Sequence, residues 1–172
     1  MHVRSLLIIV LPLVALLLLS GCFKSQVALI SEADADFPFQ SITYEFDGED
    51  DRVTLVRVGN SYAAPDEQGD STLLVKMMKP DLFVIQASVK DGTSREYLYA
   101  LAKLSGDKKS IELIKPYAEQ EDRKYAEAEN SGLTLCDDDP QLVCLTDLQS
   151  YVDYAVSSKT TEKKRIRILQ LN

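Results

Sequence analysis

Residues 82–104 read LFVIQASVKDGTSREYLYALAKL, and this segment defines the architecture that we expect for the whole chain. Its first part alternates, with Phe83, Ile85, Ala87 and Val89 on one side and Gln86 and Ser88 on the other. A period of two is typical of a β-strand with one buried face. The turn signal Asp91-Gly92 separates it from a second apolar run. The segment therefore predicts two strands that are antiparallel neighbours.

The second run, 95–104, carries apolar side chains at consecutive positions. Tyr97, Tyr99 and Leu101 share one side, and the opposite side holds Leu98, Ala100, Ala102 and Leu104. A strand that is covered on both faces has this composition. A helix over the same residues is the competing interpretation, since periodicity alone does not separate a short buried helix from a buried strand.

Turn signals continue this pattern on both sides of the segment. They lie at Asp47-Gly48, Gly59-Asn60, Gln68-Gly69-Asp70, Lys79-Pro80-Asp81 and Ser105-Gly106-Asp107. The β-rich pieces between them are 41–46, 52–58, 61–64, 71–78, 82–89, 95–104 and 110–114. Because connections this short join antiparallel neighbours, we expect a meander of six to seven strands. A twisted sheet of that width curls into a partial barrel or needs a cover.

The C-terminal part of the chain predicts that cover. Pro116 opens a helical stretch to about Glu129, and a second helix is expected over 147–157, where Thr146 to Gln149 has the form of a capping box. Its apolar stripe is Leu148, Tyr151, Val152, Ala155 and Val156. A last strand, 165–171, is expected to add to an edge of the sheet. The predicted fold class is α+β, an antiparallel β-meander as a curled sheet or partial barrel, covered by a C-terminal helical region.

The N-terminal segment has a different character. After Arg4, an apolar stretch ends in Leu19-Ser20-Gly21-Cys22. These four residues resemble the lipobox of bacterial lipoprotein precursors. The resemblance implies that residues 1–21 are a signal peptide and that Cys22 becomes the acylated first residue. An uncleaved transmembrane anchor and a signal cut elsewhere are the alternatives, although the apolar stretch is shorter than the ~20 residues of a spanning helix.

The resemblance to lipoproteins also implies a location. Cys22 is followed by Phe23, not by the aspartate associated with retention in the inner membrane. By that analogy, the protein is anchored in the outer membrane and faces the periplasm. Residues 22–40 show no steady apolar period, so we expect the lipidated cysteine and a tether there, followed by a single α+β domain over 41–172.

Two residue types bound the chemistry of the mature chain. Cys136 and Cys144 are the cysteines left when Cys22 is acylated, and an even pair in an oxidising compartment predicts a disulfide across a nine-residue loop. The sole histidine, His2, lies in the signal. Catalysis that depends on histidine is thereby removed, so we predict a protein that is not an enzyme and uses no cofactor.

The net charge of the chain limits the kinds of partner that it can bind. The chain carries a formal net charge of −8, which becomes −9 when Arg4 leaves with the signal. An acidic chain has no electrostatic reason to bind nucleic acid, and anionic headgroups repel it, so membrane contact is expected through the lipid. Basic residues gather only at the C-terminus, at Lys163, Lys164, Arg165 and Arg167. We interpret them as neutralising the acidic helix expected from Pro116 to Glu129 or as protecting a strand edge, with contact to lipid or a polyanionic wall component as the rival.

Two acidic clusters are candidate cation sites. The first holds Asp47, Glu49, Asp50 and Asp51, and the second holds Asp137, Asp138 and Asp139. The first lacks the glycine and glutamate positions of an EF-hand loop, and three adjacent aspartates do not converge on one ion. We interpret both as solvated loops and predict no metal site.

The mature part is also similar, in outline, to uncharacterised proteobacterial lipoproteins that carry a Tyr-x-Tyr-Ala-Leu strand, here Tyr97 to Leu101, and a cysteine-bearing C-terminal region. This resemblance implies a fold and no activity. We therefore expect a lipid-anchored, periplasm-facing envelope lipoprotein that is a non-enzymatic binding or structural module. An accessory subunit of an envelope complex, with an envelope protein as its partner, and a carboxylate-based hydrolase are the alternatives.

Overall fold

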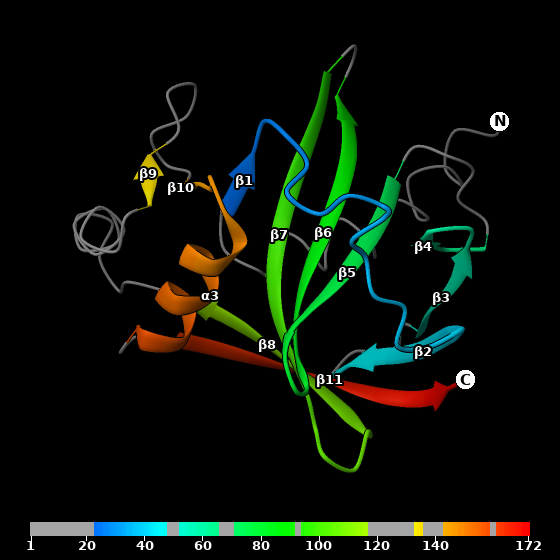
Figure 1. Cartoon of the computed structure of the whole chain (residues 1–172). Coiled ribbons are helices and arrows are strands. Elements are labelled where there is room, and N and C mark those ends of the chain that lie inside the picture. The colour runs from blue at the N-terminus through cyan, green and yellow to red at the C-terminus, as the bar shows by residue number, and fades with distance from the viewer. Residues whose placement is uncertain are drawn as a thin grey trace, which may run out of the picture.

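The computed structural model describes residues 23–47, 52–65, 71–91, 94–116, 133–135, 143–158 and 161–172. They form a closed antiparallel barrel of eight strands, in the order β6-β5-β4-β3-β2-β11-β8-β7, with β7 pairing back to β6 (Figure 1). The strands are β2 (Ser41–Phe46), β3 (Arg52–Val58), β4 (Ser61–Ala63), β5 (Ser71–Lys79), β6 (Leu82–Asp91), β7 (Ser94–Leu104), β8 (Ser110–Pro116) and β11 (Thr161–Leu171). Three short strands, β1 (Phe23–Ser25), β10 (Val143–Cys144) and β9 (Thr134–Leu135), extend the sheet from β7.

The meander is confirmed, and so is the hairpin of residues 82–104. Strand β6 pairs antiparallel with β7 along its whole length, from Leu82 opposite Lys103 to Asp91 opposite Ser94. The helix that we kept as an alternative for 95–104 is wrong. Pairing on this scale binds ten residues of each strand into one ladder, and it forms the longest hairpin of the barrel wall in Figure 1.

The barrel is closed, where we expected a curled sheet or a partial barrel. The reason is β11, which begins at Thr161 and pairs with β8 on one side and β2 on the other. The expectation that the last strand adds to a sheet edge is therefore wrong. Since β11 joins the two ends of the meander, closure removes the open edges that a curled sheet would leave.

The apolar residues form two separate cores, one inside the barrel and one outside. The inner core includes Tyr44, Leu73, Ala87, Leu113 and Ile166. The outer core lies between the barrel wall, α3 (Leu148–Ser157) and the N-terminal segment, and it includes Phe23, Ile30, Tyr99, Leu101 and Tyr151. Strand β7 supplies both cores, which confirms that it is covered on both faces.

Helix α3 covers the outer face of the barrel beside β8 (Figure 1). Its buried residues are Leu148, Tyr151, Val152, Tyr154 and Ala155, whereas Val156 of the predicted stripe is 56% exposed. The N-cap is Asp147, one residue later than predicted, and its carboxylate accepts hydrogen bonds from the Ser150 backbone N–H at 2.8 Å and hydroxyl at 2.7 Å. Among the described residues, this ten-residue helix is the one α-helix. The described part is therefore mainly β, and its helical cover is minor. Pro116 ends β8, and the helix predicted to follow it lies outside the described residues.

The N-terminal segment is part of the domain, which corrects the predicted tether. Phe23, the residue after Cys22, is 1% exposed in β1 and packs against Tyr151 of α3 with ring centroids 4.9 Å apart. Ile30 is fully buried. From there the chain crosses in front of the barrel to β2 (Figure 1). Hydrogen bonds fix it on the way, from the Asp36 N–H to the Val75 carbonyl at 2.7 Å and from the Met77 N–H to the Asp36 carboxylate at 2.7 Å.

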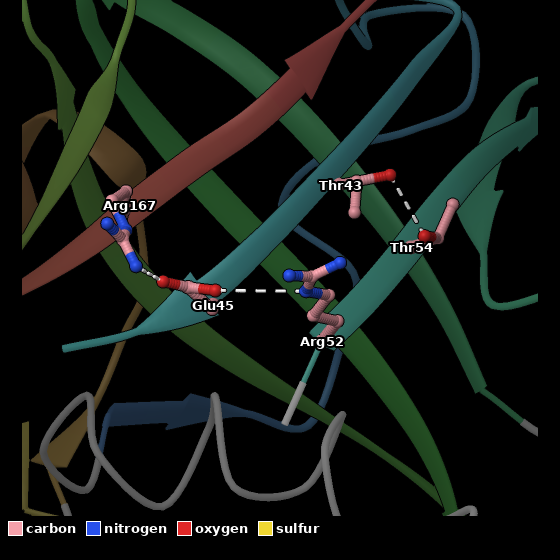
Figure 2. A network of polar contacts seen from close by, with 5 residues as sticks. All are labelled: Thr43, Glu45, Arg52, Thr54 and Arg167. Atoms are coloured by element: carbon pink, nitrogen blue, oxygen red, sulfur yellow. Dashed lines mark hydrogen bonds and ion pairs between the residues drawn. The ribbon is translucent and has the colours of Figure 1, made fainter. Parts of the chain in front are cut away.

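Charged side chains on the outer wall link neighbouring strands. Glu45 of β2 lies between Arg167 of β11 and Arg52 of β3, with 3.9 Å to the Arg52 Nε atom (Figure 2). Lys163 of β11 pairs with Glu112 of β8 at 2.8 Å. Lys163 and Arg167 therefore pair with acidic residues on adjacent barrel strands, whereas the acidic helix that we expected the basic C-terminal residues to neutralise lies outside the described residues.

Candidate functional site

The barrel encloses an apolar cavity of about 70 Å³. Its described lining comes from seven barrel strands and from the segment that precedes β2: Phe39, Ile42, Tyr44, Leu55, Tyr62, Leu73, Val75, Ile85, Ile111, Leu113 and Ile166. The cavity exists because these inward positions alternate with outward ones along each strand, and an eight-stranded barrel is just wide enough for side chains to fill its interior or hold one small ligand. Here the filling is incomplete.

Phe39 and Tyr62 close one part of the cavity wall. The Tyr62 hydroxyl donates to the Phe39 carbonyl at 2.7 Å and lies 3.3 Å from the Phe39 N–H. The Arg57 guanidinium stacks over the Phe37 ring at 4.0 Å. The Gln40 carbonyl accepts a hydrogen bond from the Arg57 N–H at 2.9 Å. The strap, which we define as residues 36–40, is thus held to β3, β4 and β5 and contributes a ring to the cavity.

The electrostatics of the cavity are those of an apolar site. Its described lining contains no charged side chain, and the polar groups of the lining residues are the tyrosine hydroxyls of Tyr44 and Tyr62. Burial raises the pKa of the Tyr62 phenol above its ordinary value of 10.0, with the Phe39 backbone hydrogen bond and Arg57 opposing the rise. The hydroxyl therefore stays protonated and neutral at physiological pH.

A second buried polar group lies outside the barrel wall. Gln86 of β6 is 2% exposed, and its Oε1 atom accepts from the Leu29 N–H at 2.9 Å, the Ile30 N–H at 2.8 Å and the Tyr99 hydroxyl at 2.9 Å. Its Nε2 atom donates to the Ile30 carbonyl at 2.9 Å. One side chain therefore satisfies the N–H and the carbonyl of the buried Ile30 and accepts from Leu29 as well, as a buried backbone requires.

Sequence reasoning missed the role of Gln86. We placed it on the solvated side of its strand because it alternates with apolar neighbours. The available signal was a glutamine opposite Tyr99, on the side of the sheet where Tyr97 and Leu101 already predicted a cover. A polar residue beneath a predicted cover indicates a buried hydrogen-bond partner.

Of the three cysteines predicted to carry the lipid or form the disulfide, the structure describes one. Cys144 is half-buried in β10, which lies between β1 and β9. Cys22 and Cys136 lie outside the described residues, as does the Asp137 to Asp139 cluster. Asp47, from the other acidic cluster, is exposed at the end of β2, and Glu49, Asp50 and Asp51 are outside the described part.

Within the described ranges, no three acidic, histidine or cysteine side chains lie close enough together to hold a metal ion. No helix in the same ranges has the length and apolar character needed to cross a membrane.

Comparison with known proteins finds no relative of this chain. The chain matches no protein-family model, no curated protein and no solved structure.

Proposed function

We propose that this protein is a lipid-anchored envelope domain that binds a ligand without catalysis, and that the barrel cavity takes the end of an aliphatic chain. The observation that carries the proposal is a cavity of about 70 Å³ whose described walls are aliphatic and aromatic side chains. Apolar cavities of this kind stay dry, and the entry of an apolar group into a dry cavity is favourable in free energy.

The size of the cavity limits the ligand. An engineered cavity of ~150 Å³ takes benzene, and this one is about half as large. We therefore expect the terminal carbons of a chain to enter while the polar end stays at the barrel mouth.

The carboxylate-based hydrolase receives less support. Such an enzyme needs two acidic groups held across a cleft, one of them with a raised pKa. None of the described residues around the cavity is acidic. The mature chain expected from the lipobox also has no histidine.

The anchor at Cys22 is the second part of the proposal. Phe23 is buried in β1 and contacts Tyr151. An acyl chain on the preceding residue would therefore join the bilayer to the domain with no intervening tether, and the face around β1 and α3 would lie next to the headgroups.

Methyl resonances test the cavity in the intact protein. The isoleucine, leucine and valine methyls are labelled with ¹³C in protein held in phospholipid nanodiscs, and octanoate is added. We expect shifts at the lining residues Ile42, Ile85 and Ile166, and none at the exposed Val58. Equal shifts at Val58, or none at the isoleucines, would overturn the cavity as the site.

Two substitutions at one lining position sharpen this test. Ile85→Ala enlarges the cavity and is expected to strengthen the octanoate shifts, whereas Ile85→Phe fills it and should abolish them. Val58→Phe adds the same ring at a position that is 58% exposed and serves as the control. If all three variants bind octanoate alike, the chain end enters elsewhere.

Mass spectrometry of the native protein tests the anchor separately. The expected mature N-terminus is an acylated Cys22. An intact Met1 or a different first residue rejects the lipid anchor and leaves the cavity proposal standing.

A further inference from the structure

A basic groove of about 380 Å³ lies on the outer wall of the barrel, away from the apolar cavity. Its walls are the β5–β6 turn, the ends of β7 and β8, the last turn of α3 and the start of β11. It continues into a second hollow of about 260 Å³ that shares Lys103 and Glu112 and adds Arg165. The cations that line the two hollows are Lys79, Lys103, Lys163 and Arg165.

The register of the barrel strands places these cations together. Lys103 of β7 lies opposite Glu112 of β8, and Glu112 lies opposite Arg165 of β11. On the far side of β7, Lys103 faces Leu82, and Leu82 faces Lys79. One row across five strands therefore carries three cations and a single carboxylate.

Only part of this positive charge is neutralised. Glu112 pairs with Lys163 at 2.8 Å. Within the part of the chain that the structure describes, Lys79, Lys103 and Arg165 have no ion-pair partner. Four cations against Glu112 and Asp81 leave a local charge of about +2 in the two hollows, on a protein whose net charge is −8.

Local charge decides what binds here. Charges beyond ~8–10 Å are largely screened at physiological salt, so the acidic remainder of the protein has little effect inside the groove. Lysine ammonium groups bind phosphate as point charges, and an arginine guanidinium adds paired hydrogen bonds to phosphate oxygens. Several cations around one hollow therefore favour a phosphate group over a carboxylate as the ligand.

The groove lies next to the proposed attachment point. The Phe23 ring, one residue after Cys22, is 6.0 Å from the Tyr154 ring on α3. Ala155 and Val156, the next residues of that helix, line the groove. Val156 is 56% exposed and adds an apolar contact at the rim.

We infer that this groove binds the phosphate of an anionic lipid headgroup. The phosphate chemistry follows from the groove alone, whereas the choice of a lipid as its source rests on the anchor proposed at Cys22. Under this inference, the groove is an exception to the expected repulsion between the acidic protein and anionic headgroups. It would hold the domain against the bilayer in one orientation, with Lys103 and Arg165 toward the headgroups.

Lysine labelling tests the inference on the lipid-anchored protein. The protein is reconstituted into vesicles of phosphatidylcholine alone or with phosphatidylglycerol, labelled with an amine-reactive reagent and analysed by mass spectrometry. We expect phosphatidylglycerol to slow labelling of Lys79, Lys103 and Lys163 about fivefold, which corresponds to one cation held at an anionic surface. Lys76, whose ammonium lies 3.4 Å from the Asp34 carbonyl, is the internal reference and should be unaffected.

A matched pair of variants and a second source of phosphate complete the test. Lys103→Gln should relieve the protection of Lys79 and Lys163, and Lys76→Gln, which removes the same charge elsewhere, should not. Inorganic phosphate added to phosphatidylcholine vesicles should protect only weakly, and equal protection would overturn the lipid assignment. Unchanged labelling in phosphatidylglycerol overturns the inference. Failure of the anchor is recognised independently, because an unacylated protein would not remain with phosphatidylcholine vesicles.

Discussion

Gln86 and Ile30 form a two-point amide pair across 56 residues of sequence. The Gln86 Oε1 atom accepts from the Ile30 N–H at 2.8 Å, and its Nε2 atom donates to the Ile30 carbonyl at 2.9 Å. Both residues are buried. This pair imitates the hydrogen bonds of a neighbouring strand, so it holds the N-terminal segment on the barrel without a ladder there.

Gln86→Leu tests how firmly that segment is held. The substitution keeps a side chain of similar volume but leaves the Ile30 N–H without its acceptor and the Ile30 carbonyl without its donor, and each buried unpaired group costs ~1–3 kcal/mol. We expect the free energy of unfolding to fall by about 3 kcal/mol in urea titrations. Amide hydrogen exchange of residues 27–30 should accelerate. Gln170→Leu, at an exposed glutamine on β11, is the control and should change stability by less than ~0.5 kcal/mol.

Tyr99 predicts a loss of stability in alkali. Burial, opposed by the hydrogen bond to the Leu29 backbone, raises the pKa of Tyr99 from 10.0 to about 12. Because the folded pKa lies above the unfolded one, this contribution to stability is complete below pH 10 and is lost as the pH rises to about 12. Burial also raises the pKa of Tyr151, so the late-titrating absorbance at the phenolate wavelength should be reduced, but not abolished, in Tyr99→Phe. If the variant titrates as the parent protein does, the assignment to Tyr99 is wrong.

Asp147 predicts the opposite behaviour in acid. Hydrogen bonds from the backbone and hydroxyl of Ser150 lower the pKa of Asp147 below 3.8. The cap therefore contributes fully above about pH 4, and its contribution is lost as the pH falls through the lower, folded value. Asp147→Ala should cost about 1 kcal/mol at pH 7, and this difference should narrow in acid. Asp153→Ala removes a carboxylate within the same helix and should cost less.

Glu45 predicts a larger loss of stability than its exposed partner Arg52. Its side chain is 10% exposed and joins Arg167 and Arg52 (Figure 2). Glu45→Gln should destabilise the barrel by about 1–2 kcal/mol, because both guanidinium groups lose a buried charged acceptor. Arg52→Gln should cost less, since this longer contact involves a side chain that is 71% exposed. Equal losses for both variants would contradict the central position of Glu45.

The cysteine pair predicts a disulfide that stabilises the chain locally. Leu135 of β9 lies opposite Val143 of β10, so the two ends of the loop that begins with Cys136 are held together. Alkylation of the denatured, unreduced protein should leave Cys136 and Cys144 unlabelled. Reduction should lower the free energy of unfolding by up to ~2.5 kcal/mol, the loop-entropy value for nine residues. Labelling of both thiols before reduction would exclude the disulfide.

Most strands could be predicted from residues alone. Alternation fixed the bounds of β2 and β3 to the residue and those of β6 and β7 to within two residues, because the period of two and the turn signals are local properties of the chain. The two-faced character of residues 95–104 likewise followed from consecutive apolar positions and required no knowledge of the partner.

The candidate site could not be predicted, because it depends on pairs of segments far apart in sequence. No local pattern indicates that β11 pairs with both β2 and β8, and that pairing turns inward-facing residues into the wall of the barrel cavity. The basic groove depends on the same registers, which bring Lys103 and Arg165 to either side of Glu112.

The amino-acid order alone therefore established the barrel strands, their turns, the acidic balance and a candidate lipid-attachment residue, since each follows from neighbouring side chains. Barrel closure, the burial of Phe23 and Ile30 against the barrel wall and the two hollows came only from the folded arrangement. The physical reason is that local backbone preference acts over a few residues, whereas burial and hydrogen-bond satisfaction are set by whichever distant segment lies on the other side.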